Sequence, residues 1–411
     1  MIYRSAVRRQ FSGLSVADVG SFWRLTGVLF LVYCSTGLWS PLLSVYVKSL
    51  GAGTRDIGLV LATFQVTSLV SQFWWGAWSD RMGRRKPLVL IGTAGLALAY
   101  LGIATSREWT WLFPIRMLEG VALAAYSTGS LALIGDLLED QGGRGRLMGL
   151  YRTFGSLAFS LAALSGGWLA DNYTIRIPLL MAAVCYSLAF ILTTQVKERT
   201  GEKQRAPVTP SPARPAAPVV EQTQRGVWAF LAMVFLWTAA MGSVVFLWPV
   251  YMQDVGYSKT AVGSLWALAA MGEVPCFILA GYLADRWGRK RVLITGMLLM
   301  ACVYLGYTIS TSLGWLIGVQ IVRSFAYASY EAPALLYTTE LGLRQQRGRL
   351  ASFYYAASGG GGIMGSVAGG AVAQETSLVT MYRGVVGLML LGTLAAGRML
   401  PRLRTVAASR G

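Results

Sequence analysis

Histidine is absent from this chain and cysteine is scarce, with 4 cysteines among 411 residues. Cys34, Cys185, Cys276 and Cys302 lie in apolar stretches without CxxC spacing, so neither a disulfide framework nor a zinc site is indicated. We interpret them as small packing residues and expect no metal and no cofactor. Without histidine, a side-chain proton carrier that works near neutral pH has to be a carboxyl group whose charged form is disfavoured by burial.

Charged residues are also few. They make up 13% of the chain, whereas soluble domains carry about a quarter. Hydrophobic residues make up 55%, and the mean hydropathy is +0.52. This composition predicts an all-α membrane protein, because an apolar helix of about 20 residues crosses the bilayer core. Twelve such stretches lie near residues 23–47, 57–78, 87–105, 110–135, 147–170, 176–196, 227–252, 260–283, 292–310, 314–338, 350–373 and 381–399.

The formal net charge of +18 does not indicate a nucleic-acid partner. With the N-terminus assigned to the cytoplasm, most Lys and Arg residues fall in cytoplasmic segments and few in outer loops. This distribution is the positive-inside bias of membrane proteins, so we expect both termini to be cytoplasmic. The first 20 residues lack an apolar stretch followed by a small-residue cleavage site, so we expect no cleaved signal peptide.

One charged loop occurs twice in the sequence. Residues 76–86 read GAWSDRMGRRK, and residues 281–291 read GYLADRWGRKR, 205 residues later. Gly51 and Gly256 match at the same offset. The run RGRL at residues 144–147 likewise recurs at residues 347–350, an offset of 203. Similar order at a nearly fixed offset indicates that the chain is a duplicated unit.

A proline-rich segment separates the two copies. Residues 197–226 combine five prolines with charged and small residues, a composition that has too little apolar surface to bury. We therefore expect a cytoplasmic linker there. The predicted organisation is listed in chain order: an N-terminal tail (1–22), a six-helix bundle (23–196), the linker (197–226), a second six-helix bundle (227–399) and a C-terminal tail (400–411).

The duplicated Gly-x-x-x-Asp-Arg-x-Gly-Arg-Arg/Lys loop on a frame of six plus six spans resembles the major facilitator superfamily. The run SPLLSVYVKSLG at residues 40–51 and the spacing Arg116-x-x-x-Gly120 are most similar to the twelve-span drug:proton antiporters. The resemblance implies a monomeric secondary transporter in a bacterial-type inner membrane, with membrane lipid around it. It also implies alternating access, a small-molecule substrate and protons as the coupling ion. The fifth span keeps Gly166 and Gly167 but lacks the glycine-proline step typical of these antiporters.

The resemblance implies that the duplicated loop gates transport. Asp80 is expected to face the amide end of the eleventh span, and Arg81 or Arg84 to pair with Asp136. Gly76 is expected to permit close helix approach. The complete predicted gating set is Gly76, Asp80, Arg81, Gly83, Arg84 and Asp136 in the first half, and Gly281, Asp285, Arg286, Gly288, Arg289 and Glu340 in the second.

Four ionisable residues are predicted to lie deep in spans, where a charge costs at least a few kcal/mol and indicates function: Glu119, Glu273, Arg323 and Glu331. Arg116 is predicted to lie at a shallower position in its span. Arg116 and Glu119 lie three residues apart on one helix, so a purely structural ion pair is an equal alternative for them. Arg323 matches Arg116 at an offset of 207.

Two of these carboxyl groups stand two residues before a proline, in Glu273-Val-Pro275 and Glu331-Ala-Pro333. A proline removes one amide and leaves a backbone carbonyl without its usual partner. Broken helices that line a cavity are where transporters bind substrates and ions, although proline kinks also serve packing alone. We expect Glu331 to carry the coupled proton. Four aromatic residues complete the predicted cavity: Tyr126, Trp266, Tyr327 and Tyr330.

Two transport functions remain open from the sequence. The first is proton-coupled export of a lipophilic or amphipathic compound. The alternative is a symporter or uniporter of a polar or anionic metabolite, in which Arg116 and Arg323 bind the anion. An enzyme is not indicated, because the sequence shows no nucleophile with a base and no nucleotide-binding motif.

Overall fold

The computed structural model describes residues 16–138, 144–196, 198, 224–341 and 347–400. Within these ranges all regular secondary structure is helical, which confirms the predicted all-α class. Most of the proline-rich linker and of the two predicted tails lies outside the described residues.

The helices fall into two series along the chain. The first series comprises α2 (Val16–Trp39), α3 (Leu43–Ser49), α4 (Thr54–Met82), α5 (Lys86–Thr105), the 3-10 helix η1 (Trp109–Trp111), α6 (Leu112–Leu138), α7 (Arg144–Asn172) and α8 (Arg176–Thr194). The second comprises α9 (Gln224–Val244), α10 (Trp248–Asp254), α11 (Lys259–Trp287), α12 (Arg289–Ile309), α13 (Leu313–Leu341), α14 (Arg347–Glu375) and α15 (Leu378–Met399).

The duplication seen in the sequence is repeated in the helix bounds. The limits of α3 and α10 differ by 205 residues, as do those of α4 and α11, while those of α7 and α14 differ by 203. Positive φ angles fall on four described glycines, which form two pairs at the same offset of 205: Gly51 with Gly256, and Gly83 with Gly288. Only glycine adopts such angles without strain, so the matched glycines mark matched turns.

Each half of the chain provides six helices of 19 or more residues, if the described residues alone are considered. Ten segments are long and apolar enough to cross a membrane. The other two long helices, α13 and α14, have 29 residues each and carry polar and glycine residues that lower their apolar character. The chain is thus a multi-pass membrane protein.

The first and seventh predicted spans are each broken near one end. Residues 23–47 were expected to form one span, but the helix stops at Trp39 and α3 begins at Leu43. Residues 227–252 are likewise divided between α9 and α10. Pro41 lies in the first gap and Pro249 in the first turn of α10, where a missing amide interrupts the helical hydrogen bonds of a continuous span. Hydropathy alone does not reveal such a break.

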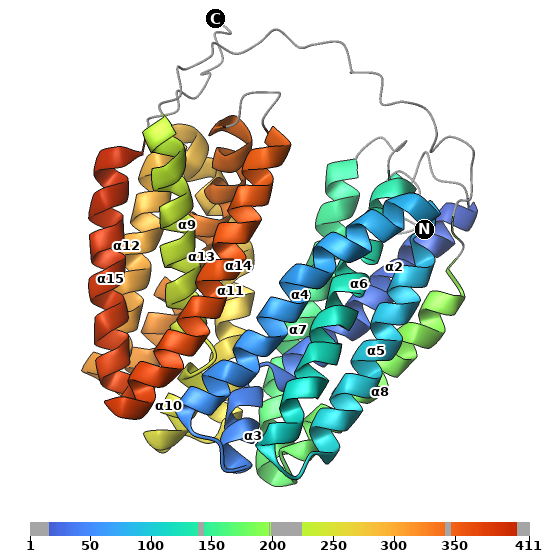
Figure 1. The fold of residues 1–411 in the computed structure, drawn as a ribbon, viewed down its shortest axis with the longest axis horizontal. Coiled ribbons are helices and arrows are strands. Elements are labelled where there is room, and N and C mark those ends of the chain that lie inside the picture. The colour runs from blue at the N-terminus through green and yellow to red at the C-terminus, as the bar shows by residue number, and fades with distance from the viewer. Residues whose placement is uncertain (1–15, 139–143, 197, 199–223, 342–346, 401–411) are drawn as a thin grey trace, which may run out of the picture. The chain divides into compact units, whose positions relative to one another are not determined.

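The chain forms two compact units, which are described separately. Unit 1 comprises residues 1–42 and 66–206, and unit 2 comprises residues 43–65 and 207–411. In unit 1, α2 packs against α7 and α8, and α5 packs against α6 and α8 (Figure 1). A buried cluster holds the second part of α4 against α5 and α6 through Trp75, whose indole N–H donates to the Val121 carbonyl over 3.0 Å.

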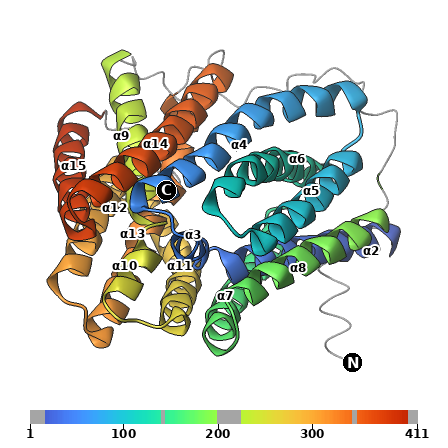
Figure 2. The ribbon, with the colours of Figure 1, turned by 60° about the horizontal axis from the view of Figure 1, so that its bottom comes forward.

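Unit 2 is built around a seam of small residues on α14. A Cβ on Gly365 would stand 2.8 Å from the Cα of Ala239 on α9, so only glycine permits this approach. The Gln65 amide of α4 donates to the Ser366 hydroxyl over 2.7 Å. Further contacts join α9 to α15, α11 to α13, α12 to α13 and α15, and α3 to α10, as Figure 2 shows for the last pair.

Candidate functional site

Glu273 and Arg323 come together inside unit 2. Glu273 lies on α11, two residues before Pro275, and Arg323 lies on α13. Their Oε1 and Nη1 atoms are 3.8 Å apart, and their side chains are 21% and 16% exposed. The contact is an ion pair between two helices that the sequence alone does not connect, and both groups keep partial access to their surroundings.

Glu331 has different surroundings, although it lies on the same helix as Arg323. The indole N–H of Trp237 on α9 donates to the Glu331 Oε1 atom over 3.3 Å. The Trp237 ring also stacks on Tyr330, with 3.8 Å between centroids and 12° between planes. Among the described residues Glu331 has no cationic side chain within ion-pair distance. A charged Glu331 therefore has one hydrogen-bond donor and no counter-ion there.

A small polar cavity lies beside Arg323. Trp266, predicted as a cavity residue, lines it together with Gln320 and Tyr307. The Tyr307 hydroxyl donates to the Gln320 Oε1 atom over 3.1 Å. The cavity has room for about one water molecule. Arg323 thus has polar neighbours on two sides: Gln320 and Tyr307 at the cavity, and Glu273 on α11.

The predicted pair in the first half is closed and buried. Arg116 donates to Glu119, and the side chains of both residues on α6 are only 1% and 2% exposed. The Tyr100 hydroxyl of α5 donates to the other oxygen of Glu119 over 2.6 Å. The Arg116 guanidinium also lies 6.0 Å from the centre of the Trp39 ring. This network satisfies its charges internally and leaves little room for a ligand.

The remaining predicted aromatic residues are divided between the units. Tyr126 is buried in unit 1, where its backbone lies against Gly92 of α5. Tyr327 lies on α13 of unit 2, and its ring meets Phe277 edge to face with 6.2 Å between centroids. Tyr327 shares a helix with Arg323 and Glu331, whereas Tyr126 shares one with Arg116 and Glu119.

The first copy of the gating loop forms the turn from α4 to α5 at Gly83, with a φ of 61°. Arg81 and Arg84, the expected partners of Asp136, are exposed. The ion pair that the structure shows at Asp136 is with Arg85, whose Nε atom is 3.8 Å from Oδ2. The side chain of Asp80 lies outside the described residues.

The second copy forms the turn from α11 to α12 at Gly288, with a φ of 89°. Asp285 and Arg286 are exposed, and Arg286 donates to the Tyr282 hydroxyl over 3.0 Å. Arg289 is half-buried, and the side chain of Glu340 lies outside the described residues. A Cβ added to Gly76 or Gly281 would meet no described atom within 4 Å, in contrast to the glycines of α14.

Two polar residues of these networks are not among the residues predicted from the sequence. Tyr100 binds Glu119, and Gln320 lines the cavity beside Arg323. Gln320 carried a usable signal, because an amide in the middle of an apolar span needs a partner. Tyr100 carried none, since most Tyr residues in membrane proteins serve packing or anchor the interface.

Comparisons with known proteins agree with this architecture. The model of a family described as "MFS_1 like family" matches residues 22–384. The maltose permease of Geobacillus stearothermophilus is 26% identical over 384 residues, which cover 88% of this chain and 92% of that protein. Multidrug resistance protein MdtG of Citrobacter koseri is 25% identical over 419 residues, or 97% of each chain. A crystal structure of a variant of the nucleoside transporter NupG matches with a TM-score of 0.80 at 14% identity, covering 93% of this chain and 100% of that one.

Proposed function

Because the chain belongs to the MFS_1 like family of major facilitator transporters, we propose that it exports a lipophilic or amphipathic small molecule in exchange for protons. Transport follows alternating access in a bacterial inner membrane, with both termini in the cytoplasm. The substrate itself is a small molecule, and the protein works as a monomer.

This proposal rests on the three ionisable residues of unit 2 that are predicted to lie deep in their spans. Two acids, Glu273 and Glu331, share their bundle with Arg323, and the ion pair goes to Glu273. At membrane depth an uncompensated charge is costly, so Glu331 lowers its cost by taking up a proton. Release of that proton creates a charge that, among the described residues, accepts a hydrogen bond from Trp237 and has no counter-ion. Proton binding at Glu331 thus changes the charge balance of the site, as coupling requires.

The anion-transport alternative has less support. It requires Arg116 and Arg323 to be available to an anionic ligand. Arg116 is buried and paired with Glu119 on its own helix, and an anion would have to displace that carboxylate. Arg323 already faces a carboxylate, so the charge near it favours neutral or cationic ligands.

The direction of transport is proposed as export. MdtG is named as a multidrug resistance protein, and it aligns over nearly the whole of both chains. The maltose permease is named for a sugar at similar identity. A substrate panel therefore needs a lipophilic cation, a neutral amphipath, a sugar and an organic anion.

Proteoliposomes with an imposed pH gradient test the proposal. We expect the wild type to move the lipophilic cation or the neutral amphipath against its gradient. Glu331→Gln should abolish this driven transport and retain substrate binding and gradient-independent exchange, because glutamine still accepts the Trp237 hydrogen bond but carries no proton. Glu375→Gln, at the exposed end of α14, is the matched control. A fully proton-driven Glu331→Gln variant would exclude this residue.

The duplicated loop is proposed as the cytoplasmic gate. Asp80→Asn or Asp285→Asn removes a charge facing a helix N-terminus, an interaction worth about 0.3 to 1 kcal/mol and up to about 2 when partly buried. We expect the cytoplasm-open state to become several-fold more populated. Spin-label distances across the cytoplasmic face measure this shift, and unchanged distances in both variants would contradict a gating role.

A further inference from the structure

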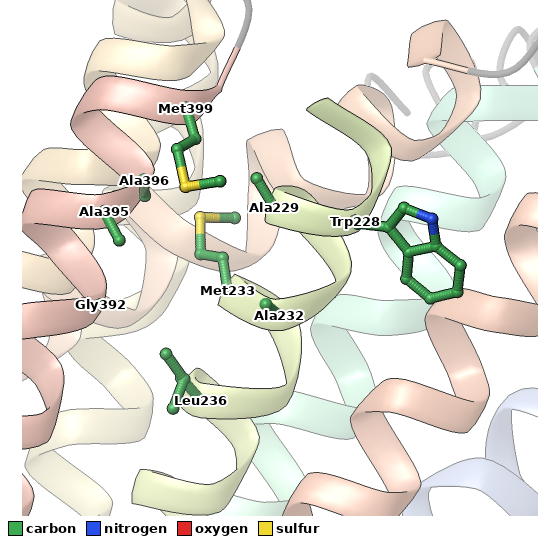
Figure 3. Close-up of a pocket in the computed structure, with 9 residues that line it drawn as sticks. All are labelled: Trp228, Ala229, Ala232, Met233, Leu236, Gly392, Ala395, Ala396 and Met399. Atoms are coloured by element: carbon green, nitrogen blue, oxygen red, sulfur yellow. The ribbon is translucent and has the colours of Figure 1, made fainter. Parts of the chain in front are cut away.

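An apolar groove runs between α9 and α15 of unit 2, away from the charged residues described above (Figure 3). Its volume is about 460 Å³. Ala229, Met233 and Leu236 form one wall, and Gly392, Ala395 and Met399 form the other. No lining residue carries a charge, and the indole N–H of Trp228, whose ring Figure 3 shows on the side of α9 turned away from α15, is the one hydrogen-bonding side-chain group among them.

Small residues keep the groove open. At one end of the groove α9 and α15 are in contact. A Cβ on Gly392 of α15 would stand 3.0 Å from the side chain of Leu236 on α9. Towards the helix ends, alanines such as Ala229 and Ala395 leave the space between the helices unfilled. Figure 3 shows the side chains of Met233 and Met399 pointing toward one another across it. Ala395 and Met399 are exposed, so the groove opens to the surface of the bundle.

The surroundings of this opening indicate its occupant. Both helices belong to membrane-spanning segments, and the groove covers the first turns of α9 and the last turns of α15. Its length along α15, from Gly392 to Met399, is about 11 Å at 1.5 Å per residue. A stretch of fatty acyl chain fits such a narrow apolar groove. The polar end of the same molecule then lies where the helices leave the bilayer core.

The charge near the end of the groove favours one class of lipid over others. Moving an acyl chain from bulk lipid into an apolar groove gains packing but little hydrophobic energy, because lipid tails are equally apolar. Selectivity therefore depends on the head group. Arg398 is exposed in the last turn of α15, next to Met399. A basic side chain at a membrane surface attracts anionic lipids.

We propose that the groove between α9 and α15 binds one acyl chain of an anionic phospholipid, with Arg398 at the phosphate. The transported compound is a different ligand, since the groove offers no charged group to bind its polar part and the acids Glu273 and Glu331 lie on α11 and α13.

Photolabelling of the full-length protein tests the site. The probes are phosphatidylglycerol and phosphatidylcholine that carry a diazirine midway along one acyl chain, each mixed into vesicles of the same bulk lipid. Mass spectrometry then locates the labels. We expect saturable labelling within residues 229–236 and 392–399, above the level at the exposed Leu188 and Ile191 of α8. Phosphatidylglycerol should label about fivefold more than phosphatidylcholine, as one interfacial basic residue contributes about 1 kcal/mol.

Variants separate this site from general lipid contact. Ala395→Phe fills the groove and should reduce labelling to the level on α8. Ala232→Phe fills it from the opposite wall, so a folding defect in either variant does not end the test. Leu394→Phe places the same aromatic ring at an exposed neighbouring position of α15 and should leave labelling unchanged. Arg398→Gln should remove the preference for phosphatidylglycerol.

Several results would overturn the proposal. Labelling that does not saturate, or that both groove-filling variants leave intact, would show ordinary lipid contact. Equal labelling by both phospholipids would reject the anionic head group. Competition by the transported compound would assign the groove to the substrate.

Discussion

The two halves of the chain handle an intramembrane arginine in opposite ways. Arg116 lies on α6 and Arg323 on α13, the fourth long helix of each half. Arg116 pairs with Glu119 on its own helix, and both are almost completely buried. Arg323 reaches across to Glu273 on α11, and both remain partly exposed. The carboxylate partner of the arginine thus lies on the same helix in the first half and on a neighbouring helix in the second.

In the function proposed above, this difference separates a structural pair from a functional one. The first-half pair has a charge balance of zero and a third partner, Tyr100, that fixes Glu119. On α11 and α13, Arg323 pairs with Glu273, whereas Glu331 has no cationic partner among the described residues. A closed, neutral pair favours a rigid bundle, whereas an incomplete set can gain and lose a proton.

The largest expected effect is on folding of the first half. Arg116→Met leaves Glu119 buried without its cation, which should cost about 3 to 5 kcal/mol of unfolding free energy. Arg323→Met should cost less, because Glu273 keeps access to its surroundings, and should impair transport instead. Unfolding followed in mixed micelles measures both. The double variant Arg116→Met/Glu119→Leu is the control and should recover much of the loss; no recovery would contradict the pair's mutual compensation.

Tyr100→Phe tests the third member of the first-half network. It removes a hydrogen bond to a charged group, worth about 1.5 to 3 kcal/mol. We expect lower thermal stability with an unchanged ratio of proton-driven transport to exchange. Tyr382→Phe is the matched control, since its buried hydroxyl has no hydrogen-bond partner among the described residues. A Tyr100→Phe variant that lost proton coupling would place Glu119 in the transport cycle.

Contacts between residues that are close in the sequence can be predicted from it, whereas contacts between distant residues cannot. The Arg116–Glu119 pair follows from a spacing of three on one helix, and the turns at Gly83 and Gly288 follow from the repeat. The pairing of Arg323 with Glu273 does not, because it depends on how α11 and α13 rotate against each other. The periodicity of either helix leaves that rotation undetermined.

The same limit explains the gating loop and the broken spans. Three arginines compete for Asp136, and their spacing does not decide between Arg81, Arg84 and Arg85; the turn at Gly83 directs Arg85 to it. The breaks after Trp39 and Val244 lie inside apolar runs that hydropathy treats as continuous. Composition therefore predicts the number of long helices better than their ends.

Trp237→Phe examines the second-half site with a smaller expected effect. Phenylalanine keeps a ring on Tyr330 but cannot donate to Glu331, and this hydrogen bond is long at 3.3 Å. We expect a change of about 1 kcal/mol, or roughly fivefold, in the ratio of proton-driven transport to exchange. Trp248→Phe in the same unit is the matched control, because its buried indole N–H has no partner among the described residues. Equal effects of the two variants would mean that ring packing, not the hydrogen bond, matters.

The smallest effect is expected at an exposed ion pair between α3 and α10. Lys48 of α3 and Asp254 of α10 are 2.6 Å apart, but their side chains are 44% and 47% exposed. Exposed pairs contribute about 0 to 1 kcal/mol, and salt screens them over about 8 Å at physiological ionic strength. Lys48→Gln and Asp254→Asn should each change the unfolding free energy by less than about 1 kcal/mol, and their coupling in a double-mutant cycle should vanish at high salt. A larger, salt-resistant coupling would show that exposure does not govern the strength of charge pairs in this protein, and the contrast between Arg116 and Arg323 would then need another cause.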